Sequence, residues 1–186
     1  EISKALQGIG YTTKGLDFSS EAIKIGQANG LDCDIADLDQ GIPVGDDSYD
    51  VVWAGDVIEH VFDPILVLSE VSRVMKSDGK FYATIPYDIN YKARIKTAFG
   101  ISYQESVYRQ FNQFKHHSFF SERLMRYMFE TARLKITNLT YVINMTTLLP
   151  NFSKNEDLTY KKKFTKSKFL RIFSYLMIVE AEKNNE

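Results

Sequence analysis

The chain contains 186 residues, which is enough for one domain with its own hydrophobic core. Hydrophobic residues make up 44% and charged residues 25% of the sequence, which excludes disordered and collagen-like proteins. The 23 basic and 24 acidic side chains give a net charge of −1, so a generally basic nucleic-acid binder is disfavoured. The single cysteine, Cys33, excludes a disulfide framework, and no signal peptide or membrane span is visible. We therefore expect a cytoplasmic protein.

The first half of the sequence predicts strands that alternate with helices. The predicted segments are a helix at 2–7, a strand at 12–18, a helix at 21–28, strands at 31–36 and 49–54, a helix from 64 and a strand at 80–85. Segment 49–54 has a continuous apolar centre, which is typical of a strand covered on both faces. Residues 77–79 (SDG) indicate a turn.

The second half is organised differently. It predicts a polar and aromatic stretch at 88–115, an amphipathic helix at 121–134, a strand at 135–144, an irregular polar insertion at 146–168 and a last strand at 172–181. The alternation in the first half, with its short connections, favours an α/β fold in which a parallel sheet carries helices on both faces.

Acidic residues end two of the predicted strands. Asp17 ends one strand before a helix that Ser19 caps, and Asp37 follows the next strand. Ligands of open α/β sheets bind beyond the carboxyl ends of the strands, where a carboxylate such as Asp17 can accept hydrogen bonds from a ribose diol. Asp37 can in the same way accept a hydrogen bond from an adenine amino group. The alternative for each is an ordinary turn aspartate, which for Asp17 is favoured beside a helix N-terminus.

Titratable side chains follow the strand that ends with Trp53 and Ala54. Small residues at Ala54 and Gly55 let a ligand approach the backbone closely, and Asp56 and His60 come directly after them. Either Asp56 or His60 could act as a general base. A helix-start histidine with a purely structural role is the simpler interpretation of His60.

Two histidines, His116 and His117, precede the amphipathic helix. Together with Phe119 and Phe120 they could line a substrate pocket. Alternatively, the two phenylalanines belong to the core and Ser121 caps the helix. Adjacent histidines diverge and the spacing fixes no third ligand, so we expect no metal site.

Seven short segments carry a combined signal that none of them carries alone. They are GLDFS at 15–19, ADL at 36–38, DDSYDVV at 46–52, VIEHV followed by DP at 57–64, VSRVMKSDG at 71–79, HHSFFS at 116–121 and YLMIVEAEK at 175–183. Their order and spacing resemble the class I S-adenosylmethionine (SAM)-dependent methyltransferases that act on small molecules. The resemblance implies a Rossmann-like, three-layer α/β/α fold with a mostly parallel sheet and an antiparallel last strand.

The resemblance also implies SAM as the cofactor and S-adenosyl-L-homocysteine as its product. Six residues would contact the cofactor: Asp17, Phe18, Asp37, Leu38, Trp53 and Ala54. Asp17 would bind the ribose hydroxyls, Asp37 would meet the adenine amino group, and Trp53 would lie against the sulfonium and methionine part. The candidate general bases, needed only for an acceptor that must lose a proton, are His60, Asp56 and His116.

The glycine-rich loop that follows the first strand of this family is absent. Gly8 and Gly10 follow a helix-like segment and precede a strand, so they match the turn before the family's second strand instead. In this fold the first strand lies at the centre of the sheet, and its loss would leave two strand edges unpaired. We therefore expect residues 1–186 to be a single methyltransferase domain lacking its N-terminal strand, which either precedes the given sequence or comes from another chain.

The methyl acceptor is expected to bind between a lid or substrate segment at 87–120, rich in Tyr and Phe, and the insertion at 146–168. Residues 154–171 hold seven basic side chains against two acidic ones, and this excess could attract an acidic or lipid-headgroup partner. A solvated loop is the simpler interpretation. The Asn/Asp-Pro-Pro-Tyr motif of the amino-methylating DNA enzymes is missing, since its position reads AGDV, so no sequence-specific nucleic-acid partner is expected.

Three functions follow from this sequence. The first is a SAM-dependent methyltransferase that acts on oxygen or nitrogen of a small molecule. The second is a methyltransferase-fold protein without catalytic activity that serves as a partner or regulatory subunit, because fold does not imply function. The third is a nucleotide-dependent oxidoreductase, which is disfavoured by the late strand pair at 135–144 and 172–181.

Overall fold

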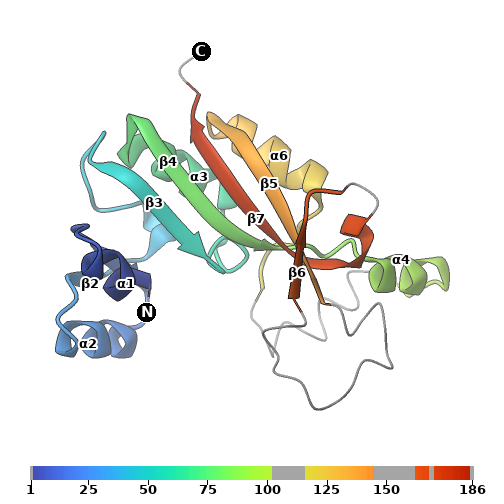
Figure 1. Cartoon of the computed structure of the whole chain (residues 1–186), viewed down its shortest axis with the longest axis horizontal. Coiled ribbons are helices and arrows are strands. Elements are labelled where there is room, and N and C mark those ends of the chain that lie inside the picture. Colours follow the sequence, from blue (N-terminus) through green and yellow to red (C-terminus); the bar gives the residue numbers. More distant parts are fainter. Residues whose placement is uncertain (1, 102–115, 145–161, 168–169, 185–186) are drawn as a thin grey trace. The chain divides into compact units, whose positions relative to one another are not determined.

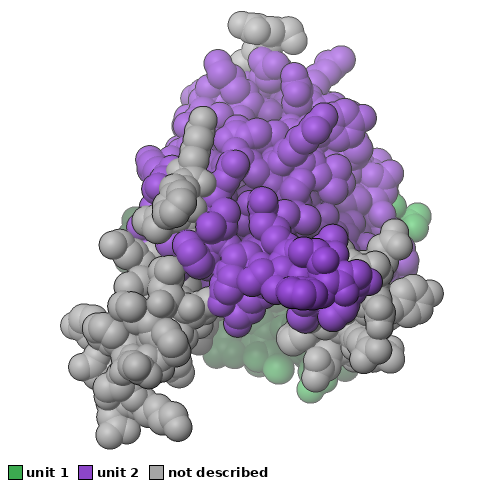
Figure 2. Space-filling view, turned by 90° about the vertical axis from the view of Figure 1, so that its right-hand side faces the viewer, with its two compact units in different colours: residues 1–43 green, residues 44–186 purple. Residues whose placement is uncertain are grey.

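The computed structural model of the chain describes residues 2–101, 116–144, 162–167 and 170–184. The chain divides into two compact units, residues 1–43 and residues 44–186, which Figure 2 colours green and purple. None of the helices among the described residues is long and apolar enough to cross a membrane.

Unit 1 is a small α/β unit built on two parallel strands. Its elements are α1 (Ile2–Gly8), β1 (Gly15–Asp17), α2 (Ser20–Ala28), β2 (Cys33–Ile35) and the 3-10 helix η1 (Leu38–Gln40). β1 pairs with β2 in parallel, with Asp17 opposite Ile35. Ser19 caps α2 as predicted, because its hydroxyl accepts the N–H of Ala22 at 3.2 Å. The helix buries Ile23.

Unit 2 is a five-stranded mixed sheet with helices. Its elements are β3 (Tyr49–Gly55), α3 (Pro64–Val74), β4 (Met75–Pro86), α4 (Tyr91–Ala98), α6 (Glu122–Thr131), β5 (Leu134–Asn144), β6 (Lys162–Thr165), η3 (Leu170–Phe173) and β7 (Ser174–Lys183). The strand order is β3-β4-β7-β5-β6, with β3 and β4 parallel (Figure 1). β7 lies between β4 and β5 and is antiparallel to both, so the predicted antiparallel last strand is confirmed.

The core of unit 2 lies between its sheet and the helices α3 and α6, which cover one face (Figure 1). Buried and half-buried residues alternate along β4, so that Phe81, Ala83 and Ile85 point into the core. From α6, Met125 and Phe129 are buried against them, and the rings of Phe81 and Phe129 lie 5.8 Å apart. Each such phenylalanine contributes about 1.5–3 kcal/mol by its burial.

Two predicted boundaries are wrong. Residues 77–79 lie inside β4 and not in a turn before it, because the β3–β4 pairing begins with Tyr49 opposite Met75 and resumes after an irregularity with Val51 opposite Lys80. α6 ends at Thr131, three residues before the predicted end. Arg133 adopts a left-handed backbone with φ of 57°, and β5 begins directly after it.

The prediction that the strand at 49–54 is covered on both faces is also wrong. β3 is an edge strand of its sheet, and Val51 and Trp53 each keep 43% of their surface exposed. The helices that contact the sheet within unit 2, α3 and α6, lie on one face of it. Among the described residues of unit 2, nothing therefore supplies the second cover of β3 that its apolar sequence suggested.

Candidate functional site

Two exposed carboxylates stand at the carboxyl ends of the parallel strands of unit 1. Asp17 ends β1, and its Oδ1 accepts the N–H of Ser19 at 2.8 Å. Asp37 follows β2, and its Oδ1 accepts the N–H of Asp39 at 3.1 Å at the start of η1. The N–H of Ala36 donates to the carbonyl oxygen of Asp17 at 3.1 Å and ties the two strand ends together. Each carboxylate keeps Oδ2 without a hydrogen-bond partner among the described residues.

Apolar side chains accompany both carboxylates. Phe18, next to Asp17, remains 77% exposed, and Leu38, next to Asp37, is half-buried. Because an exposed phenylalanine ring has little contact with its own unit, it is accessible to a ligand. Two acceptor oxygens beside apolar surface fit an adenosine group, which offers hydroxyl and amino donors and a flat base. The residues of unit 1 thus fit this part of SAM.

The end of β3 in unit 2 presents a tryptophan. The indole of Trp53 folds over Gly55, where an added Cβ would lie 2.9 Å from Nε1. Glycine is therefore required for this ring position. Ala54 is only 7% exposed, so a ligand at this strand end would meet the half-exposed indole and the backbone and not the Ala54 methyl group. This arrangement also fits the role predicted for Trp53 and Ala54.

Three titratable side chains meet at one place in unit 2. The ligand atoms of Glu59, His60 and His116 all lie within 4.8 Å of one another, a spacing that would allow them to ligate one cation. The rings of His60 and His116 stand edge to face with centroids 4.9 Å apart. The N–H groups of His117 and Ser118 donate to the carbonyl oxygen of Glu59 at 2.7 and 3.2 Å, which brings the segment before α6 onto the loop after β3.

Glu59 is the member of this cluster that the sequence did not single out. Only 1% of it is exposed, and its Oε2 has no hydrogen-bond partner among the described residues. Burial raises the pKa of Glu59 from 4.5 to about 7, and the charges of Asp56 and Asp88 act in the same direction. The sequence could have pointed to Glu59, because a charged residue lies there between the apolar Ile58 and Val61, which are both buried.

The remaining catalytic candidates are held in different ways. Asp56 has a φ of 53°, and its N–H donates to Oγ1 of Thr84 at 2.9 Å. The Thr84 hydroxyl donates back to Oδ1 of Asp56 at 2.9 Å, which fixes this carboxylate after β3. Burial, followed by the nearby His60, lowers the pKa of His116 below its usual 6.5. His116 is therefore neutral at pH 7 and can accept a proton.

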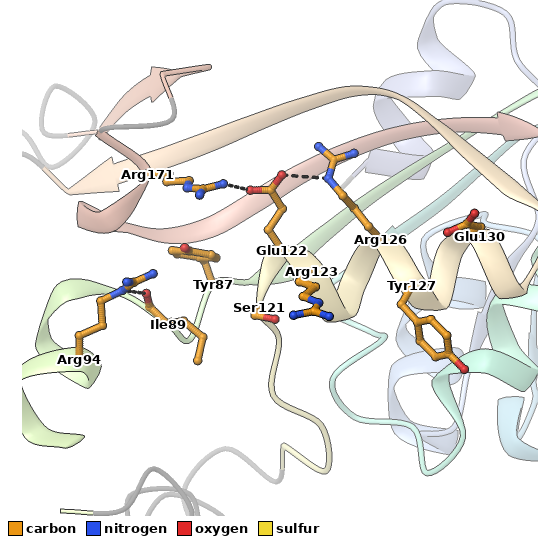
Figure 3. Close-up of a pocket in the computed structure, with 10 residues that line it drawn as sticks. All are labelled: Tyr87, Ile89, Arg94, Ser121, Glu122, Arg123, Arg126, Tyr127, Glu130 and Arg171. Carbon is orange, nitrogen blue, oxygen red and sulfur yellow. Dashed lines mark hydrogen bonds and ion pairs between the residues drawn. The ribbon is translucent and has the colours of Figure 1, made fainter. Parts of the chain in front are cut away.

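A pocket of about 510 Å³ opens beside the end of β4 and contains none of the predicted cofactor or catalytic residues (Figure 3). Tyr87, Ile89 and Arg94 line it from the predicted substrate segment at 87–120. Residues 102–115 of that segment, and 146–161 of the predicted insertion, lie outside the described residues.

The methyltransferase-domain family model matches residues 1–83, a stretch that contains all six predicted cofactor contacts and also Asp56, Glu59 and His60. Several solved structures that superpose on the chain are described as SAM-dependent methyltransferases. The family model thus matches 83 of the 186 residues, and the chain as a whole has the fold of the class I SAM-dependent methyltransferases. The predicted α/β, Rossmann-like fold class is thereby confirmed, except that the described strands make two parallel and three antiparallel pairings and not a mostly parallel sheet. The match over residues 1–83 supports the predicted family and its cofactor, SAM, while the roles of the individual site residues stay predictions.

Three similar proteins illustrate what the chain resembles. The ubiquinone biosynthesis O-methyltransferase of Thiobacillus denitrificans is 26% identical over 109 residues, which cover 55% of this chain and 46% of that protein. The dimethylglycine N-methyltransferase of Parasynechococcus marenigrum is 47% identical over 45 residues, 24% of this chain and 16% of that protein. A SAM-dependent methyltransferase structure from Methanosarcina mazei superposes with a TM-score of 0.66 at 16% identity, over 99% of this chain and 87% of that chain. At 16% identity the structural likeness establishes the fold. The chain spans less than half the length of these curated relatives, 46% at most.

Proposed function

We propose that this protein transfers a methyl group from SAM to an oxygen or nitrogen atom of a small molecule. The observation that carries the proposal is the pair of exposed carboxylates, Asp17 and Asp37, at adjacent parallel strand ends. Each has a free Oδ2, and both lie within the stretch matched by the methyltransferase family model. In this role Asp17 accepts hydrogen bonds from the ribose hydroxyls and Asp37 from the adenine amino group, with Phe18 and Leu38 against the base.

SAM supplies an electrophilic methyl group carried by a sulfonium ion. The protein's main contribution is therefore to hold the nucleophile and the methyl carbon in line, which removes most of the entropic barrier. The half-exposed indole of Trp53 offers a π face to the cationic part of the cofactor. The backbone beside Ala54 and Gly55 allows close approach, because neither residue carries a large side chain.

An acceptor that must lose a proton needs a general base, and the cluster after β3 provides one. A ring nitrogen of neutral His116 accepts the proton, and His60, 4.9 Å away between ring centroids, is the alternative acceptor. The resulting imidazolium is stabilised by the carboxylates of Glu59 and Asp56 on the same loop. One similar protein is named as an O-methyltransferase and another as an N-methyltransferase. These names support a hydroxyl acceptor and an amine acceptor equally.

The proposal is tested by isothermal titration of the full chain with SAM and with S-adenosyl-L-homocysteine, and by methyl transfer to a panel of phenols and amines. Saturable binding of both compounds and a methylated product are expected. If neither compound binds, the non-catalytic partner role becomes the better description. Thermal protection by NAD without protection by SAM would instead favour the oxidoreductase.

The general base is tested with histidine variants on whichever acceptor the wild type methylates. His116→Gln or His60→Gln should lower kcat by about 10²–10⁴-fold, the usual contribution of general-base catalysis, while the Kd for SAM is unchanged. His117→Gln is the matched control, since the contact of His117 with Glu59 is made by its backbone N–H. An equal loss of kcat in all three variants would mean that neither His60 nor His116 is the base.

A further inference from the structure

The pocket beside the end of β4 is unusually rich in arginine. We name it the arginine pocket, and the residues that matter for its chemistry are Tyr87, Arg94, Glu122, Arg123, Arg126 and Arg171 (Figure 3). They come from the segment after β4, from α4, from α6 and from η3. Four guanidinium groups thus surround a space that also contains two carboxylates, those of Glu122 and Glu130.

The carboxylate of Glu122 already accepts three hydrogen bonds. Its Oε1 accepts the Nε–H of Arg126 at 2.9 Å, and its Oε2 accepts the hydroxyl of Tyr141 at 2.6 Å together with Nη1 of Arg171. The side chain is 18% exposed, so these bonds form at the wall of the pocket and not in open solvent. Glu122 therefore fixes the guanidinium of Arg171 at the pocket (Figure 3), and among the described residues it accepts no hydrogen bond from Arg94 or Arg123.

Two arginines of the pocket have no carboxylate partner among the described residues. Arg94 donates its Nε–H to the carbonyl oxygen of Ile89 at 3.1 Å, which anchors the guanidinium and leaves both Nη groups available. Arg123 makes no hydrogen bond or ion pair with any of the described residues. A planar guanidinium with free Nη groups is the side chain best suited to bind a carboxylate or a phosphate with two parallel hydrogen bonds.

We propose that the arginine pocket binds the oxyanion, carboxylate or phosphate, of a small acidic molecule. Arg94 and Arg123 donate hydrogen bonds to the oxyanion, and Arg171, held by Glu122, adds a further guanidinium to the wall of the pocket. Ile89 and Tyr127 also line the pocket and remain partly exposed, so they can contact the remainder of the molecule.

A short stretch of chain connects the pocket to the catalytic candidate His116. Ser121 lines the pocket and His116 precedes it by five residues, so their Cα atoms are at most about 17 Å apart. Phe120 and Asp88 exchange two hydrogen bonds, of 2.8 and 3.0 Å, which join the segment before α6 to the segment after β4. If the proposed methyl transfer holds, the acidic molecule is the methyl acceptor, and its reactive hydroxyl or amine reaches toward His116.

The test is a calorimetric titration of the full chain with three ring compounds: benzoate, phenyl phosphate and the neutral benzamide. Benzoate or phenyl phosphate should bind, benzamide should not, and the affinity should fall as salt concentration rises. Whichever oxyanion binds more tightly identifies the acidic group. Equal binding of benzamide, or no saturable binding of either anion, would overturn the proposal.

Site variants locate the binding. Arg94→Gln and Arg123→Gln should each raise the Kd for the anion by about tenfold or more, which is the scale of a hydrogen bond to a charged group. Arg123→Lys should restore part of the loss because it keeps the charge. Lys92→Gln is the matched control, since it removes a cation from the same helix as Arg94 without lining the pocket. A loss in Lys92→Gln equal to that in Arg94→Gln would show a general charge effect and contradict the site.

The acceptor assignment rests on the proposed function, and a separate SAM titration keeps the two apart. Anion binding without SAM binding would leave the arginine pocket standing and remove the methyltransferase role. SAM binding without anion binding would overturn the arginine pocket and leave the methyltransferase role standing.

Discussion

Asp17 and Glu59 are both carboxylates with one oxygen that has no partner among the described residues, but their surroundings differ. Asp17 is exposed at the end of β1, so its free Oδ2 is hydrated until a ligand replaces the water. Glu59 is buried and its Oε2 accepts no hydrogen bond from the described residues, so its ionised form is disfavoured. Exposure therefore makes Asp17 a candidate for binding and makes Glu59 a group whose charge depends on pH.

Replacement of Asp17 should weaken SAM binding directly. Asp17→Asn keeps an Oδ1 that can accept the N–H of Ser19 but puts an amide donor where Oδ2 accepts from a hydroxyl. The expected loss is about 1.5–3 kcal/mol, or roughly 10–150-fold in Kd. Isothermal titration with SAM measures it, and Glu21→Gln, an exposed acid on α2, serves as the control. An unchanged Kd in Asp17→Asn would mean that β1 does not carry the ribose contact.

Glu59 should make the stability of the protein fall with rising pH. Its pKa is 4.5 in the unfolded chain and about 7 in the folded protein, so the folded state binds the proton more tightly. Unfolding then releases a proton between about pH 4.5 and 7, and stability is lost as pH rises through that window. A pKa shift from 4.5 to about 7 lowers the free energy of unfolding by about 3 kcal/mol above pH 7, relative to its value below pH 4.5.

The variant Glu59→Gln isolates this effect, because glutamine stays neutral at every pH. Its free energy of unfolding should exceed that of the wild type above pH 7 and approach it near pH 4.5. Urea denaturation at a series of pH values gives both curves. Parallel curves for Glu59→Gln and the wild type would show that Glu59 titrates normally in the folded protein.

The end of β3 depends on one backbone position. Gly55 lies under the indole of Trp53, and an alanine Cβ there would come within 2.9 Å of Nε1. Gly55→Ala should therefore push the ring away from the strand end while the strand pairing with β4 persists. Since Trp53 is the only tryptophan in the sequence, its fluorescence reports the change without further labels.

We expect Gly55→Ala to shift the emission maximum of Trp53 and to weaken SAM binding. Gly45→Ala is the matched control, because a Cβ at Gly45 would meet only the Ser48 hydroxyl, at an ordinary 3.7 Å. An unchanged spectrum in Gly55→Ala would mean that the indole does not rest on Gly55 in solution.

At the scale of the whole molecule, protection from hydrogen exchange should follow the two sheets. β7 is paired on both sides, by β4 and by β5, whereas β1 and β2 have three residues each and pair only with one another. Amides of β7 should exchange only on global unfolding, and those of β1 and β2 much faster by local opening. Mass spectrometry of peptides separates these regions. If SAM binds at Asp17 and Asp37, it should slow exchange in β1 and β2; slower exchange only elsewhere would contradict those contacts.

Features that depend on nearby residues could be predicted from the sequence. Ser19 and Ser121 were identified as helix caps because a cap joins residues three apart, and each hydroxyl accepts the expected N–H group. The carboxylates Asp17 and Asp37 were found because a short strand and its following turn are visible in the local pattern. The positions of these helix caps and strand-end carboxylates were therefore predictable from the sequence.

Features that depend on distant residues could not be predicted. Glu59 and His60 meet His116 across more than 50 positions, and no periodicity reports that contact. The arginine pocket gathers Arg94, Arg123 and Arg171 from three different elements. The exposure of Val51 could not be predicted either. An apolar run shows that a strand can be covered, but it does not show which helices cover it.

The order in which the strands are made differs from the order in which they pair. β4 and β5 are synthesised first, yet neither pairs with the other, and each awaits the later β7. On the ribosome both strands therefore emerge with an open edge, which is a site for pairing with the wrong partner. A protease cut between Thr165 and Ser174, with loss of the downstream piece, would leave β3–β4 and β5–β6 with no strand pairing between them.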